Sequence, residues 1–98
     1  MSRAAETAWL GPRVQAEALA GILNGKGFTT TVLTGGGHQH HPCVEITGGP
    51  RWQGTEWVYA APEDGNWWFW WSSLELIAPV GEVTLAAEQI ARVLAGRP

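Results

Sequence analysis

The chain has 98 residues and a formal net charge of -3, and this length suits one domain, over residues 1–98, with a single core. A hydrophobic fraction of 45% with 15% charged residues is typical of a folded globular protein. The basic residues form no stripe that could follow phosphates, so we expect no nucleic-acid partner. One cysteine excludes an intramolecular disulfide, and the sequence has neither a signal-peptide core nor a membrane-spanning stretch. We therefore expect a cytoplasmic protein without membrane contact.

Apolar residues at helical spacing predict a first helix over residues 12–24. Pro12 suits the first helical position, and Gly25 supplies a stop. The Ala-rich segment before it, residues 1–11, could add a further helical turn or two or be loosely ordered.

Four segments rich in β-branched or aromatic residues predict strands, and their short connections favour an antiparallel meander. The predicted strands cover residues 28–34, 43–47, 57–61 and 67–71. The composition of residues 62–66 is typical of a tight turn and predicts a hairpin between the last two strands.

A closing helix is predicted from Glu82 to Leu94, where apolar residues again recur at helical spacing before Gly96. Both helices must bury an apolar stripe, and the natural place is one face of the sheet. The sequence thus predicts an α+β fold, a two-layer sandwich of helix, four-stranded antiparallel meander and helix, with both helices on one sheet face.

The strand from Trp67 to Trp71 reads Trp-Trp-Phe-Trp-Trp and has no polar face. Because side chains alternate along a strand, Phe69 shares a face with Trp67 and Trp71, while Trp68 and Trp70 share the other. The helices can cover only one of these faces. We predict that the other binds a partner, and the candidate residues are Trp57, Tyr59, Trp68 and Trp70.

Three occupants of the second aromatic face stay open at this point. The chain's own N-terminal segment could cover it with Trp9 as a plug, a second copy could pack on it, or a ligand or heterologous partner could bind there. The favoured function is a non-enzymatic protein-interaction module, an adaptor, chaperone-like or regulatory accessory protein, acting through this face as a monomer or homodimer.

A second candidate site is the group His38, His40, His41 and Cys43, which could offer imidazoles and a thiolate to zinc. The neighbouring glycine run and the absence of paired zinc-ligand spacings favour a solvated loop instead. We expect no cofactor. The alternative function is a small-ligand or metal-binding protein in which this loop, with zinc, and the Trp face form the site.

Catalytic signatures are missing: the sequence has no glycine-rich phosphate loop, nucleophile elbow or His-Glu-x-x-His motif. The acids near the aromatic hairpin are expected to be solvated strand ends and turn residues; they are Glu56, Glu63, Asp64 and Glu75. We therefore expect no enzymatic activity.

From Tyr59-Ala60-Ala61-Pro62 through Trp67-Trp68-Phe69-Trp70-Trp71 to the Ala-rich closing helix, the chain resembles a group of short actinobacterial proteins. The resemblance covers about the last half of the chain. It implies a bacterial, cytoplasmic origin and brings no established activity.

Overall fold

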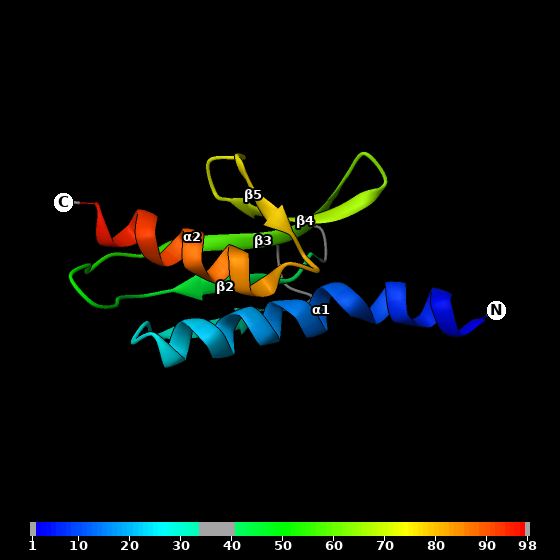
Figure 1. Ribbon diagram of the computed structural model, residues 1–98, viewed down its shortest axis with the longest axis horizontal. Helices are drawn as coiled ribbons and strands as arrows, with labels where there is room; N and C mark the ends of the chain where they lie inside the picture. Colours follow the sequence, from blue (N-terminus) through cyan, green and yellow to red (C-terminus); the bar gives the residue numbers. More distant parts are fainter. Residues whose placement is uncertain (1, 34–40, 98) are drawn as a thin grey trace.

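The computed structural model describes residues 2–33 and 41–97, with side chains from residue 11 onward. Its elements, drawn in Figure 1, are α1 (Ser2–Gly25), β1 (Thr30–Leu33), β2 (Cys43–Ile46), β3 (Glu56–Glu63), β4 (Asn66–Trp71), β5 (Leu76–Pro79) and α2 (Val83–Ala95). Consecutive strands pair antiparallel in the order β1-β2-β3-β4-β5. The predicted α+β class and meander are confirmed, with one strand more than the four expected.

Both helices bury their apolar stripes against the same face of the sheet. The stripe of α2 consists of Ala86, Ala87, Ile90 and Leu94. These residues form one cluster with α1 residues Ala16, Leu19, Ala20 and Leu23 and with sheet residues Val44, Ile46, Val58, Ala60, Phe69, Trp71 and Ala78. In Figure 1 the helices run lengthwise along the molecule, and α1 extends past the sheet at its N-terminal end. The predicted two-layer arrangement is confirmed.

The predicted start of the first helix at Pro12 is wrong, because α1 begins at Ser2 and Pro12 lies inside it. Proline removes one helical hydrogen bond, but its fixed φ is compatible with a helix. The preceding residues are Ala-rich and have high helix propensity. The backbone of residues 2–11 therefore continues the helix, which is one of the two alternatives that the sequence left open.

The hairpin between β3 and β4 forms as predicted, and its turn is tighter than residues 62–66. Asp64 and Gly65 have φ values of 52° and 84°, and two left-handed central residues are typical of a type I′ turn. Glu63 pairs with Asn66 across it, which fixes the register of both strands.

Strand β5 was not expected from the sequence. It follows β4 through a short turn in which the Leu74 N–H donates to the Trp71 carbonyl at 2.9 Å and the Trp71 N–H donates to the Glu75 carbonyl at 2.8 Å. The strand has four residues and ends at Pro79. A proline is tolerated there because β5 is an edge strand.

The expectation that Glu56 is solvated is wrong, since only 5% of the residue is exposed. Its Oε1 accepts hydrogen bonds from Ser72 Oγ at 2.6 Å and from the Trp57 N–H at 2.9 Å. Its Oε2 accepts one from Arg97 Nη2 at 3.2 Å, and the Arg97 guanidinium lies 5.4 Å from the centre of the Trp71 ring. This carboxylate therefore ties the C-terminal end of the chain to the sheet.

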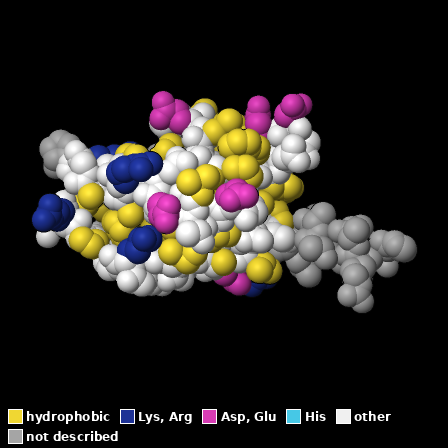
Figure 2. All heavy atoms as spheres, in the orientation of Figure 1, with side chains coloured by type: hydrophobic (Ala, Val, Ile, Leu, Met, Phe, Trp, Pro, Cys, Tyr) yellow, Lys and Arg dark blue, Asp and Glu magenta, His cyan; other side chains and the backbone are white. Residues whose placement is uncertain are grey.

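In Figure 2 acidic side chains lie along the edge that carries the strand hairpins and also on the middle of the surface, where they adjoin basic ones. The view shows no large patch of one charge. Of the two helices in the described part of the chain, neither combines the length and apolar character that a bilayer crossing requires.

Candidate interaction face and neighbouring pocket

The sheet face away from the helices carries a row of side chains that crosses all five strands. Pairing across the sheet places the members opposite one another in the order Leu33, Cys43, Tyr59, Trp70 and Leu76, and a register shift between Phe69 and Trp70 precedes the last pair. Every member is apolar except for the thiol of Cys43 and the hydroxyl of Tyr59. The row brings Tyr59 and Trp70, two of the predicted partner-binding residues, side by side.

The other two predicted residues lie in shorter rows on either side of this one. Trp57 pairs with Glu45, which pairs with Thr31. The second row consists of Ala61, Trp68 and Pro79. The structure thus brings all four predicted residues to one face, and we call the three rows together the open aromatic face.

Exposure along β4 separates Phe69 and Trp71 from the open aromatic face, whereas Trp67 at the start of the strand is half-buried. Phe69 on the helix side is fully buried, at 0% exposure, and Trp71 is 8% exposed. On the open aromatic face Trp68 and Trp70 are half-buried, and Leu33 and Leu76 are each 43% exposed. The helices therefore cover the Phe69 face, and the apolar surface around Trp70 is left uncovered by either helix.

Two indole N–H groups of the open aromatic face donate hydrogen bonds within the chain. Trp70 Nε1 donates to the Ala61 carbonyl on the neighbouring strand at 3.1 Å. Trp57 Nε1 donates to Glu45 Oε2 at 3.2 Å. Because both donors are used within the chain, these rings present hydrocarbon to the outside without needing an acceptor from a partner. Glu45 is the one charged side chain in the three rows.

Cys43 lies under this surface and is 5% exposed. Its burial, followed by the charge of Glu45, raises the pKa of the thiol to about 11. Burial likewise raises the pKa of the Tyr59 hydroxyl. A nucleophilic cysteine needs a depressed pKa, so this environment argues against catalysis by Cys43.

The structure describes two of the four candidate zinc ligands, His41 and Cys43. His38 and His40 lie outside the described residues, and the His41 ring packs edge-on against Trp67 with the ring centres 5.6 Å apart. Within residues 2–33 and 41–97 no three His, Cys, Asp or Glu side chains are grouped as a metal site would require. Zinc binding stays a prediction.

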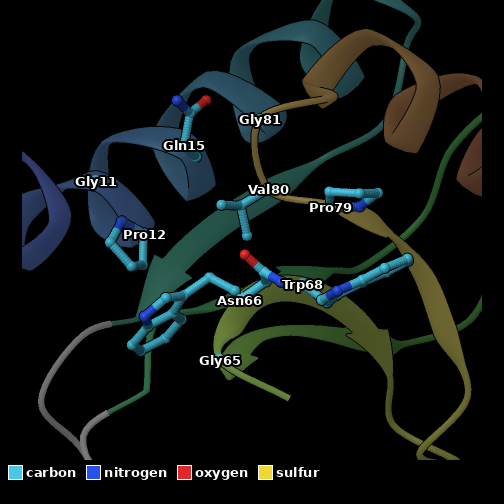
Figure 3. A pocket seen from close by; sticks show the side chains of 10 residues that line it. Gly11, Pro12, Gln15, Gly65, Asn66, Trp68, Pro79, Val80 and Gly81 are labelled. Atoms are coloured by element: carbon cyan, nitrogen blue, oxygen red, sulfur yellow. The ribbon is translucent and has the colours of Figure 1, made fainter. Parts of the chain in front are cut away.

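A pocket of about 500 Å³ lies beside the open aromatic face (Figure 3). Three distant segments line it: the middle of α1, the start of β4, and the connection from β5 to α2. The lining residues are Gly11, Pro12, Gln15, Gly65, Asn66, Trp67, Trp68, Pro79, Val80 and Gly81. Trp68 belongs to both features, whereas sequence reasoning had assigned no binding role to the other residues.

No protein-family model, curated protein or solved structure matches this chain. The resemblance to short actinobacterial proteins therefore stays a prediction.

Proposed function

We propose that the chain is a non-enzymatic protein-interaction module that binds through its open aromatic face, with a second copy of the chain as the occupant. The observation that carries this proposal is the row of side chains from Leu33 to Leu76, which crosses the whole sheet with no helix over it. Contiguous exposed apolar surface of this kind typically marks an interaction site.

A second copy fits the chemistry of this face. Two sheets pack face to face through apolar side chains at about 10 Å, and such a pair needs few hydrogen bonds across the interface. The Trp57 and Trp70 N–H groups are already bound within the chain. A two-fold axis along the central strand β3 would set β2 of each copy over β4 of the other, which keeps the two Glu45 carboxylates apart.

The size of the face sets the expected affinity. Five strands spaced about 4.8 Å apart, each about 15 to 25 Å long, give a footprint of roughly 400 Å². This is at the small end for specific interfaces, which bury about 800 Å² of accessible surface per partner. We therefore expect a reversible dimer with a Kd of about 1 to 100 µM.

The module is proposed to act in the cytoplasm, which fits a lone, buried thiol. Nucleic acid and anionic membrane are poor occupants of a face whose charged side chains, Glu45 and Glu63 at the hairpin end, are both acidic, because both partners attract basic surfaces.

The test is the mass in solution of wild type and of two lysine variants. Trp57→Lys places a charge on the open aromatic face at a position that is 36% exposed in the single chain. Leu85→Lys places the same charge on the outer side of α2 at a position that is 44% exposed. Static light scattering at increasing protein concentration should give a wild-type mass that rises toward twice 10.6 kDa.

Leu85→Lys should follow the wild-type curve, and Trp57→Lys should stay at the mass of one chain, because burying an ammonium in an apolar interface is costly even when Glu45 lies beside it. Circular dichroism should show that both variants are folded. A wild type that remains monomeric at concentrations well above about 100 µM would overturn the proposal, as would a dimer that Trp57→Lys leaves intact.

A further inference from the structure

We infer that the pocket between α1, β4 and the β5–α2 connection is a binding site for a small, uncharged, planar aromatic ligand carrying an amide-like polar group. This inference does not rest on self-association, because Trp67 lines the pocket and lies outside the open aromatic face, although Trp68 belongs to both. The pocket volume of about 500 Å³ lies within the range of known small-molecule sites.

Charge is the first criterion for the ligand. No Asp, Glu, Lys, Arg or His is among the described residues that line the pocket. A charged ligand would therefore find no ionic partner in the lining, whereas a neutral ligand needs none.

Shape is the second criterion. The apolar lining comes from several sides: Pro12 from α1, the Trp67 and Trp68 rings from β4, Pro79 from the end of β5 and Val80 from the connection to α2. Figure 3 shows Pro12 and Val80 on the helix side of the space and Trp68 beside Pro79 across from them. A flat ring can contact such surfaces on both of its faces. A sugar would instead leave most of its hydroxyls without partners.

Polar groups in the lining set the third criterion. Gln15 and Asn66 each carry an amide that can both donate and accept. Among the described residues, neither of these amides nor the Trp67 and Trp68 indole N–H groups has a hydrogen-bond partner. This contrasts with Trp57 and Trp70, whose N–H groups are bound. One amide group on the ligand could pair with these uncommitted donors and acceptors.

Two glycines keep the pocket open. A Cβ added at Gly11 or Gly81 would meet no atom within 4 Å, so neither glycine is required by close packing. Gly11 also lies inside α1, where glycine weakens a helix. Larger side chains at these positions would occupy the space that the ligand needs.

The test uses benzamide as the probe, with benzoate as its charged counterpart and methyl glucoside as a sugar. A ligand of this size should bind with a Kd of about 1 to 10 mM, which NMR titration of the 15N-labelled indole resonances can measure. We expect benzamide to shift the Trp67 and Trp68 signals, and benzoate and the glucoside to bind at least about tenfold more weakly.

Gly11→Leu and Gly21→Leu form a matched pair, because both are glycines of α1 with open space at the Cβ position and only Gly11 lines the pocket. Gly11→Leu should raise the benzamide Kd by about tenfold or more, and Gly21→Leu should leave it unchanged. Gly81→Leu gives a second way to fill the pocket if Gly11→Leu does not fold.

Three results would overturn this inference: no benzamide binding to wild type, equal binding of benzoate, or equal binding after the pocket is filled. Shifts confined to Trp57 and Trp70 would also overturn it, since these residues belong to the open aromatic face alone. A monomeric wild type would contradict the proposed dimer but leave the Trp67 result standing.

Discussion

The two faces of β4 carry the same kind of side chain in opposite roles. Phe69 and Trp71 face the helices and belong to the core, whereas Trp68 and Trp70 face away from them and stay half-buried. The difference between the faces is made by the helices, because α1 and α2 both bury their stripes on the Phe69 side. Aromatic content alone therefore does not distinguish a core residue from an interaction residue; the covering element does.

The largest expected effect compares Phe69→Ala with Trp70→Ala. Removing the fully buried Phe69 ring should lower the free energy of unfolding by about 3 to 5 kcal/mol. Trp70→Ala should cost about 1 to 2 kcal/mol in dilute protein, because the ring is half-buried in the single chain.

Urea unfolding at two protein concentrations sharpens this comparison. If the open aromatic face holds a second copy, the cost of Trp70→Ala should grow with concentration, since association stabilises the folded state by mass action. The cost of Phe69→Ala should be the same at both concentrations, because this variant keeps the open aromatic face. Equal costs for the two variants would show that the two faces are not energetically distinct.

The next effect concerns Cys43, which lies on the open face and is nonetheless buried. Its folded-state pKa of about 11 is raised above the ordinary value of 9.0. Below about pH 9 the Cys43 thiol is protonated in both the folded and the unfolded chain, and the free energy of unfolding does not depend on it. Between about pH 9 and 11 the thiol ionises in the unfolded chain and stays protonated in the folded one. The free energy of unfolding should therefore fall by about 2 to 3 kcal/mol across this window.

Unfolding of wild type and Cys43→Ala at pH 8, 9, 10 and 11 checks this expectation. The variant should lose less stability over the window, with a residual decline from Tyr59, whose raised pKa acts in the same direction. Identical pH profiles would mean that water reaches the thiol through the aromatic rings.

A smaller effect compares two carboxylates, one on each face. Glu56→Ala should cost about 2 kcal/mol, because Ser72 and the Trp57 N–H lose their acceptor in a buried site. Glu45→Ala should cost below about 0.5 kcal/mol, because its hydrogen bond to Trp57 is exposed. Urea denaturation of the two variants measures both, and a larger cost for Glu45→Ala would reverse the assignment of the faces.

Local patterns were sufficient to predict the faces of the sheet. Side chains alternate along a strand, so Phe69 and Trp70 must lie on opposite faces of the sheet. The hairpin turn at Asp64 and Gly65 sets the register, and with it which β3 residues lie beside each of them. That is why Trp57 and Tyr59 were correctly grouped with Trp68 and Trp70 on one face.

Features that depend on distant contacts were not predictable in this way. Glu56 is buried because Arg97, 41 residues away in the chain, folds back onto it. Trp52 is 7% exposed although it lies outside every predicted element. The pocket joins three segments that only the packing of α1 against the sheet brings together. Strand β5 has only four residues, which is too short for a recognisable strand pattern in the sequence.

The short edge strands have a consequence for how the molecule can assemble. Both β1 and β5 have four residues, and β5 ends in Pro79, which has no N–H to offer to another strand. Addition of strands at an edge would propagate without limit into a fibre, whereas pairing through a two-fold face is complete after one partner. The sheet thus discourages open-ended polymerisation while leaving its broad surface available to a closed assembly.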